Sequence, residues 1–367
     1  MKRLFALVVL FALAGCGAAA FVMYQRINQP YRGYDAAEQF VDVPPGVGSR
    51  SIGERLAAAG VVRDPWTFRV ALYISGQGRH LKAGEYRFDR PMRPSEVIDK
   101  IALGDVFQIS LTFPEGLTIA EMSKIFESHG FGTAADFVAA ARDVEPIRAI
   151  DPVARDLEGY LFPETYALPR KTSASKLVRL MVSRFDHVLT PAVREAAAAH
   201  NLSVRQLVTL ASIVEKETAK PEERPQVAAV YHNRVRIGMA LQCDPTVIYA
   251  LTRAGRYDGN LHRDDLMFDS PYNTYRYPGL PPGPIASPGR ASLEAAANPA
   301  SVDYLYFVSR NDGSHEFART LDEHNRNVQK YQVEFFKAGR ADRGEAGRAG
   351  RAGRAGGAGR AGRRDKG

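Results

Sequence analysis

The sequence contains very few cysteines. Its 367 residues include only two, Cys16 in an apolar N-terminal run and Cys243 far away in the body of the chain. Two cysteines placed like this cannot build the disulfide framework that holds small secreted proteins together. The cellular compartment therefore has to be inferred from the N-terminus.

The body of the chain also lacks an excess of either charge. The formal net charge is +8, but residues 338–367 alone hold nine Lys/Arg against three Asp/Glu, and Lys2 and Arg3 supply the remainder. A nucleic-acid-binding domain carries its basic patch on the folded part. We therefore expect no nucleic-acid partner.

Motifs for metal ions and phosphate groups are missing as well. The eight histidines are scattered, and none has the HExxH spacing of a zinc enzyme. The glycine-rich residues 338–367 repeat Ala-Gly-Arg without the strand and helix that a phosphate loop needs. We expect no metal and no cofactor, and the composition of this tail predicts disorder.

What is present begins with a long apolar run. Residues 4–23 contain no charge, and they follow Lys2 and Arg3. At about 1.5 Å per residue, 20 helical residues cross a hydrocarbon layer of roughly 30 Å. Positive charge before the run favours a cytoplasmic N-terminus. Residues 1–25 are therefore predicted to be a transmembrane anchor.

Two other N-terminal structures compete with this anchor. Residues 13–16 read Leu-Ala-Gly-Cys, which resembles a lipobox and would mean cleavage before Cys16 and a lipid on its sulfur. A cleaved signal peptide is the third choice. The apolar run extends beyond what either alternative needs, which favours the transmembrane helix. All three place the body outside the cytoplasm.

The body reads as an α+β protein with two small βα modules before a larger domain. The first module, residues 38–105, starts with a strand and a Pro-Pro-Gly turn, and the second, residues 106–150, repeats strand, Pro-x-Gly turn and helix. Residues 151–337 form the larger mixed domain. The predicted elements are strands at 40–43, 84–88, 109–113 and 304–308, and helices at 51–59, 66–74, 93–103, 118–128, 203–217 and 321–336.

One helix of the larger domain carries a candidate catalytic acid. Ser203 caps it, and its apolar residues from Leu207 to Val214 share one face. At about 100° per residue, Glu217 falls roughly 50° from the centre of that face, and Glu215 falls much farther away. Desolvation there would raise the pKa of Glu217, as a general acid near neutral pH requires. The alternative is a buried glutamate paired with Arg224 or Arg234.

A second polar cluster follows this helix. Gln242, Asp244 and Thr246 alternate, so an extended chain would put them on one face. Amides and hydroxyls beside aromatic rings suit sugar recognition, and the Pro/Gly run at 279–285 could frame a groove. A purely structural loop is the alternative. The second stretch of candidate sugar-binding residues is Tyr272, Asn273, Thr274 and Tyr275.

Four strings of residues then carry a resemblance to a known family. They are LASIVEKET (210–218), VYHNRVRIGMALQCDPTVIYAL (230–251), SPYNTYRYPGLPPGPIASPG (270–289) and YLYFV (304–308). Together they resemble the YceG-like family, the MltG-type endolytic murein transglycosylases. The resemblance covers an N-terminal membrane segment, a LysM-like module and a catalytic domain to about residue 335. It does not cover the Ala-Gly-Arg tail.

The resemblance implies roles for individual residues. The second glutamate of the Glu-Lys-Glu triplet, Glu217, would be the catalytic acid, and Glu215 and Glu223 would be supporting groups. Gln242 and the Tyr272-Asn273 pair resemble groove elements of other lytic transglycosylases. Cys243 departs from the family pattern, and we expect it to be inert packing.

The resemblance also implies a reaction and a place. The substrate would be the β-1,4 bond between N-acetylmuramic acid and N-acetylglucosamine in nascent peptidoglycan glycan strands. The products would carry 1,6-anhydro ends, and strand elongation would stop. The implied partners are peptidoglycan synthases, and the implied location is the bacterial inner membrane, with the catalytic body in the periplasm.

Two rival functions remain open from the sequence. The chain could be a non-catalytic murein-binding scaffold for synthesis enzymes. It could also be a hydrolase that uses water, because an ordinary glycosidase needs a second carboxylate. The candidates for that second carboxylate are Glu164, Asp244 and Asp269.

Overall fold

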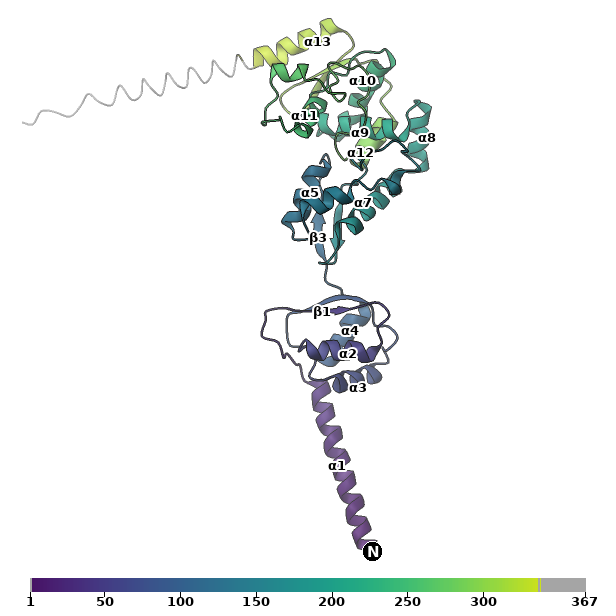
Figure 1. The fold of residues 1–367 in the computed structure, drawn as a ribbon, viewed down its shortest axis with the longest axis vertical. Helices are drawn as coiled ribbons and strands as arrows, with labels where there is room; N and C mark the ends of the chain where they lie inside the picture. Colours follow the sequence, from purple (N-terminus) through teal and green to yellow (C-terminus); the bar gives the residue numbers. More distant parts are fainter. Residues whose placement is uncertain (1, 336, 338–367) are drawn as a thin grey trace, which may run out of the picture. The chain divides into compact units, whose positions relative to one another are not determined.

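The computed structural model describes residues 2–335 and 337, and it divides into two compact units (Figure 1). The N-terminal unit comprises Met1–Leu111 and Tyr166–Thr172, and the C-terminal unit comprises Thr112–Thr165 and Ser173–Gly367. Helices and short two-stranded sheets occur in both units, so the predicted mixed α+β class is confirmed. The predicted disorder of residues 338–367 lies outside the described residues.

The chain begins with helix α1, Lys2–Asn28, which has no buried residue. It is long and apolar enough to cross a membrane, and it continues three residues past the predicted end of the anchor. Its last turn contacts the rest of the N-terminal unit. Arg26 Nη1 lies 3.4 Å from Asp64 Oδ2, and Ile27 packs against the hydrophobic core.

The core of the N-terminal unit lies between one two-stranded sheet and three helices. Strands β1 and β2 are antiparallel, with Gln39 opposite Phe88 and Val43 opposite Gly84. Because side chains alternate along a strand, Val41 and Val43 face the same core as Tyr86 and Phe88. The elements are β1 (Gln39–Val43), α2 (Ser49–Ala58), α3 (Pro65–Ser75), β2 (Gly84–Phe88) and α4 (Pro94–Leu103).

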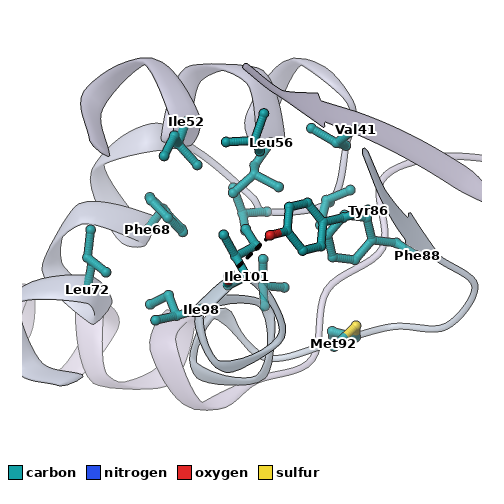
Figure 2. Packing of buried hydrophobic residues seen from close by; sticks show 14 of the residues in the cluster. Val41, Ile52, Leu56, Phe68, Leu72, Tyr86, Phe88, Met92, Ile98 and Ile101 are labelled. Carbon is teal, nitrogen blue, oxygen red and sulfur yellow. Dashed lines mark hydrogen bonds between the residues drawn. The ribbon is translucent and has the colours of Figure 1, made fainter. Parts of the chain in front are cut away.

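One buried hydroxyl joins the sheet of this core to its last helix. Figure 2 shows Tyr86 among the apolar side chains, with its hydroxyl pointing to α4. The hydroxyl donates to the carbonyl of Ile101 at 3.2 Å and to that of Lys82 at 2.8 Å. A buried tyrosine usually needs such partners, and here they fix α4 against β2.

The predicted repeat of strand, turn and helix is present. After β1, Gly46 takes φ +78° before α2, and after β3 (Ile109–Thr112), Gly116 takes φ +76° before α5 (Ile119–Ser128). Glycine adopts this left-handed conformation at little cost. The two repeats do not form two separate modules, because β3 pairs with β4 (Thr165–Leu168) and the boundary between the units falls inside β3.

The C-terminal unit is mainly helical. Figure 1 shows α9 among the other helices of this unit, and α9 contacts α8, α10, α11 and α12. After α5, the helices are α6 (Ala134–Ala140), α7 (Ala174–Val188), α8 (Pro191–Ala199), α9 (Val204–Glu217), α10 (Arg224–Arg236), α11 (Asp244–Arg253), α12 (Arg290–Ala297) and α13 (Leu321–Val328). The strands are β5 (Tyr306–Ser309) and β6 (His315–Ala318), and short helical turns lie at η1 (Glu145–Ile147), η2 (Pro221–Glu223), η3 (Arg263–Met267) and η4 (Gln329–Glu334).

Helix α9 begins where the sequence predicts. The Ser203 hydroxyl accepts from Gln206 N at 3.2 Å, and the Gln206 side chain accepts from Ser203 N at 2.9 Å. This reciprocal capping box satisfies two backbone donors that a helix start leaves free. From Leu207 to Val214 every residue of α9 is buried. The helix is therefore a fixed support for its last residue, Glu217.

The Pro/Gly run packs directly onto α9. Ile285 N donates to the Ser212 hydroxyl at 3.0 Å. Gly159 lies beneath this loop with φ +83°, and a Cβ there would meet Pro284 Cβ at 2.4 Å. Only glycine fits both that conformation and that close approach. The loop is thus held tightly against the central helix.

Candidate active site

Glu217 is the last residue of α9, and its carboxylate lines a pocket of about 260 Å³. The pocket lies wholly within the C-terminal unit. It is built from the end of α9, from α10, from the connection to α11 and from more distant segments. The lining residues are Glu217, Tyr231, Arg234, Leu241, Gln242, Asp244, Tyr275, Phe307 and His324.

Two buried side chains hold the carboxylate of Glu217. The Tyr231 hydroxyl, from α10, donates to Glu217 Oε1 at 2.8 Å. The Cys243 thiol is a second hydrogen-bonding neighbour, and both Tyr231 and Cys243 are almost fully inaccessible to solvent. Cys243 is buried, as expected of a packing residue, and burial raises the pKa of its thiol, so it stays protonated beside the predicted catalytic group.

Glu217 has no ion-pair partner in the part of the chain that the structure describes. Arg224 pairs with Glu215 instead, with 3.0 Å between Nη2 and Oε1. The Arg234 guanidinium lines the pocket but donates to the carbonyls of Leu305 and Leu241, each at 2.7 Å. The alternative of a glutamate neutralised by either arginine is not what the structure shows.

This environment raises the pKa of Glu217. Burial is the main cause, because it disfavours the charged carboxylate. The hydrogen bonds from Cys243 and Tyr231 act in the opposite direction, and the negative charge of Asp244 raises the pKa further. Glu217 can therefore keep a proton at a higher pH than an exposed glutamate.

The predicted extended segment at 242–246 is wrong. Gln242 has φ +50°, and α11 already starts at Asp244, so the alternating residues cannot share one face. Gln242 and Asp244 line the pocket, but Thr246 is fully buried. The Thr246 hydroxyl donates to the carbonyl of Cys243 at 2.7 Å and lies 2.9 Å from the Thr274 hydroxyl. Thr246 thus fixes the turn that presents Gln242.

Of the second predicted stretch, residues 272–275, only Tyr275 lines the pocket. Tyr275 reaches the pocket, and its hydroxyl donates to Asp244 Oδ1 at 2.6 Å. Asn273 is fully buried and donates to the carbonyls of Leu266 and Phe268 at 2.9 and 2.8 Å. Thr274 is also buried. Asn273 and Thr274 therefore shape the loop, and neither lines the pocket.

Tyr272 lies outside the group that lines the pocket. Its ring packs against that of Tyr249, with 5.0 Å between the ring centres, and Arg253 lies over the same ring at 5.8 Å. The structure therefore brings Gln242, Asp244 and Tyr275 to Glu217, but it does not bring Tyr272 there.

Two further acids support the end of α9. Glu215 accepts from Gly289 N at 2.9 Å as well as pairing with Arg224. Glu223 accepts from His315, at 2.9 Å from its backbone N and 2.7 Å from its ring. Burial alone would raise the pKa of Glu223, but the bonds from His315 outweigh it and lower that pKa.

Five residues that line the pocket were not among the predicted site residues: Tyr231, Arg234, Leu241, Phe307 and His324. Tyr231 and Arg234 lie three residues apart in α10, so they share a face, and both stand in one of the family strings. That spacing could have identified them. Phe307 comes from β5 and His324 from α13, and no local pattern connects either residue with Glu217.

Comparison with known proteins agrees with this architecture. A model of the YceG-like family matches residues 41–330. An endolytic murein transglycosylase of Bacillus subtilis (strain 168) is 31% identical over 330 residues, which are 85% of this chain and 90% of the relative. Another, from Streptococcus pneumoniae serotype 2, is 31% identical over 363 residues, which are 90% of this chain and 65% of the relative.

A solved structure is similar as well. The crystal structure of a yceG-like protein from Listeria monocytogenes matches with a TM-score of 0.54 and 31% sequence identity. The match covers 79% of this chain and 98% of that chain.

Fold and site together define a protein with a membrane-length helix, a small mixed unit and a helical unit that holds a buried carboxyl group in a polar pocket. The matched range spans most of the chain. This chain belongs to the YceG-like family, as its motifs predicted. The curated relatives named above carry the name of the predicted enzyme class, endolytic murein transglycosylase.

Proposed function

We propose that this chain is an endolytic murein transglycosylase, a lyase that cuts peptidoglycan glycan strands with Glu217 as its acid. The observation that carries the proposal is the environment of this carboxyl group. Glu217 lines a polar pocket, has no cationic partner among residues 2–335 and accepts a hydrogen bond from Tyr231. Its raised pKa suits a group that must carry a proton to a leaving oxygen.

The first step would be proton transfer from Glu217. The proton goes to the oxygen that bridges C1 of N-acetylmuramic acid to N-acetylglucosamine. The C1–O bond then breaks with oxocarbenium-like charge at C1. As Glu217 becomes a carboxylate, the Tyr231 hydroxyl at 2.8 Å stabilises the new charge, because hydrogen bonds to ionised groups are stronger than neutral ones.

The second step would close a ring within the same sugar. The Glu217 carboxylate takes the proton of the C6 hydroxyl, and O6 bonds to C1 to give the 1,6-anhydro end. No water is consumed. An internal hydroxyl held close to C1 has a high effective molarity, which replaces the activated water of a hydrolase.

The remaining pocket residues would bind the sugars. Gln242, Asp244 and Tyr275 offer an amide, a carboxylate and a phenol beside Glu217. His324 lines the same pocket and offers its imidazole ring to the sugar. Thr246, Asn273 and Thr274 would act through the loops that they hold, and Tyr272 would contact the strand only outside this pocket.

Helix α1 supports a proposal for the place of the reaction. A single helix of membrane length would anchor the catalytic unit on the periplasmic side of the bacterial inner membrane, where nascent strands emerge. Cutting there would end strand elongation. The LysM-like N-terminal unit would hold the glycan, and peptidoglycan synthases would be the partners.

One observation keeps a hydrolase as the second candidate. Asp244 lines the pocket with Glu217 and could activate a water. The other two candidates for a second carboxylate are engaged elsewhere. Glu164 forms a two-point ion pair with Arg184, at 2.7 and 2.8 Å, and Asp269 accepts from the Tyr277 hydroxyl at 2.7 Å.

The product decides between these candidates. The full chain in detergent is incubated with uncrosslinked glycan strands, and the fragments are weighed by mass spectrometry. We expect 1,6-anhydro ends, one water lighter than hydrolysis products, and a loss of about 10²- to 10⁴-fold in rate for Glu217→Gln. Glu195→Gln, an exposed position on α8, is the matched control and should keep full activity.

Each other outcome has a clear meaning. Fragments that carry an added water, lost in Asp244→Asn, would establish the hydrolase. Glycan binding without cleavage by either the parent chain or Glu217→Gln, even with a peptidoglycan synthase present, would establish the scaffold.

A further inference from the structure

An aromatic and basic surface lies on α3, next to the end of α1. Trp66 and Tyr73 leave 60% and 89% of their surface exposed, and Arg69 lies over the Trp66 ring, with 5.4 Å from its guanidinium carbon to the ring centre. We call Trp66, Arg69 and Tyr73 the α3 face. Large exposed aromatic side chains gathered on one helix indicate an interaction surface.

The spacing of the α3 face follows from the helix itself. Residues at i, i+3 and i+7 lie on one side of an α-helix, and Trp66, Arg69 and Tyr73 have this spacing. The opposite side of α3, with Phe68 and Leu72, is buried in the core of the unit. The core therefore holds the α3 face outward.

Helix α1 fixes the depth at which the α3 face lies. The uncharged residues 4–23 span about 30 Å, the thickness of the hydrocarbon layer, so the last turn of α1 would emerge among the headgroups. In that turn Arg26 pairs with Asp64 at 3.4 Å, and Asp64 caps α3 by accepting from Thr67 N at 2.8 Å. Figure 1 shows α3 at the end of the unit from which α1 leaves. The first turn of α3 is thus tied to the level of the headgroups.

The charges around the α3 face are basic. Among residues 2–335, no acidic side chain lies within ion-pair distance of Arg69 or Arg79. The nearby acids are engaged with other groups, Asp64 with Arg26 and Asp99 with Gln77 at 2.7 Å. Arginine near an anionic leaflet is attracted to it by about 1 kcal/mol, or about fivefold in affinity.

A recess beside the α3 face has room for a small polar group. Its volume is about 620 Å³, and its lining includes Trp66, Arg69, Tyr73, Gly76 and Arg79. Two arginines next to two aromatic rings match the chemistry of a phospholipid headgroup, because guanidinium binds phosphate and amphipathic rings prefer the membrane interface.

We propose that the α3 face binds the headgroups of anionic phospholipids in the leaflet from which α1 emerges. The proposal rests on α1 crossing a membrane, as proposed above, but not on the chemistry of Glu217. Binding at this face would hold the N-terminal unit against the membrane surface instead of leaving it on a single helix. Glycan stacking on the same rings is the competing use, and the link to α1 and the unpaired arginines favour lipid.

Trp66 makes the proposal directly testable, because it is the chain's single tryptophan. The full chain is reconstituted in vesicles of phosphatidylglycerol whose acyl chains carry bromine near the headgroup. We expect bromine to quench Trp66 emission and the vesicle to shield Trp66 from acrylamide, relative to detergent. Both effects should weaken in phosphatidylcholine vesicles.

Charge reversal supplies the matched comparison. The double variant Arg69→Glu/Arg79→Glu should bind phosphatidylglycerol more weakly through the α3 face, by at least fivefold for each arginine. The weaker binding is measured as a loss of Trp66 quenching by bromine. Arg55→Glu, an exposed position on α2 outside the surface, should leave quenching unchanged. Glycan cleavage by both variants, at the rate of the parent chain, reports that the C-terminal unit is intact.

Three results would overturn the proposal. Trp66 could be equally open to acrylamide in vesicles and in detergent. Its emission could answer to added glycan strands and not to brominated lipid, which would make the α3 face a sugar surface. Alkaline carbonate could extract the chain from the vesicles, which would show that α1 does not cross the membrane. That result would leave the test of Glu217 unaffected.

Discussion

Three glutamates near the end of α9 show how neighbours set the chemistry of one residue type. Glu215 is buried against Arg224, and Glu223 is bound by His315, which lowers its pKa. Glu217 has only neutral hydrogen-bond donors around its carboxylate, and burial raises its pKa. Glu217 forms no ion pair among the residues that the structure describes, and this separates it from the two structural glutamates.

Tyr231 is expected to position Glu217 and to tune its pKa. Tyr231→Phe removes a hydrogen bond of 2.8 Å that lowers the pKa of the carboxyl group. Without it the pKa rises, so the loss of activity at high pH should move to higher pH. We also expect kcat to fall about 10- to 150-fold, because a hydrogen bond to an ionised group contributes about 1.5–3 kcal/mol.

The measurement is a pH–rate profile of glycan cleavage. Tyr277→Phe removes a comparable phenol hydroxyl, bound to Asp269 at 2.7 Å, and should leave the profile in place. A fall in kcat without any movement of the profile would mean that Tyr231 only packs beneath the pocket.

At the scale of elements, buried polar links decide how the helices of the C-terminal unit meet. Glu158 joins two of them, accepting from Ile119 N at the start of α5 at 3.0 Å and from the Tyr249 hydroxyl on α11 at 3.2 Å. Burial raises the pKa of Glu158 to about 8. Two hydrogen bonds do not offset the loss of hydration.

The raised pKa of Glu158 should therefore make the free energy of unfolding depend on pH. The pKa in the folded state is above the ordinary value of 4.5, so the folded state holds the proton more tightly. This contribution is full below about pH 4.5 and is lost as the pH rises through about 8, by on the order of a few kcal/mol.

Chemical denaturation of the parent chain and of Glu158→Gln, monitored by far-ultraviolet circular dichroism across this range, tests the assignment. The variant keeps an acceptor for Ile119 N but cannot titrate, so its free energy of unfolding should vary less with pH. Glu195→Gln, an exposed position, should behave like the parent chain. Equal pH dependence in all three would refute the role of Glu158.

At the scale of the whole molecule, neither compact unit is one continuous piece of chain. Residues 166–172 return to the N-terminal unit, where Arg170 pairs with Glu85 at 2.6 Å and lies 3.7 Å above the centre of the Phe40 ring. The chain thus passes between the units at three places, and the anchored unit and the catalytic unit cannot be separated by a single cut.

The anchor itself gives a prediction at this scale. The uncharged run continues past Cys16 to Met23, farther than a lipoprotein signal needs, so we expect an uncleaved transmembrane helix and no lipid on the sulfur. Intact-mass measurement of the chain purified from bacterial membranes should show residues 2–15 in place, and Cys16→Ser should fractionate with the membrane as the parent does. A chain that starts at Cys16 with added diacylglycerol would establish the lipoprotein instead.

Local patterns predicted most elements because their signals are local. The capping box at Ser203 and Gln206 marked the start of α9, and the glycines at 46 and 116 marked two turns before helices. Predictions were less accurate where contacts between segments decide the structure. The strand expected at 304–308 is Tyr306–Ser309, whose register is set by pairing with β6, and the helix expected at 321–336 changes at Gln329 to a wider turn.

The sequence by itself determined the family, the apolar anchor run and the acid at the end of an amphipathic helix, because each of these is written in adjacent or helically spaced residues. The tertiary structure alone decided which polar residues surround that acid. Gln242, Asp244 and Tyr275 meet Glu217, whereas Thr246 and Asn273 turn inward. Tyr231, Phe307 and His324 join them from separate elements. Such neighbours depend on how helices pack and on single backbone angles, such as the positive φ of Gln242, which no spacing along the chain reveals.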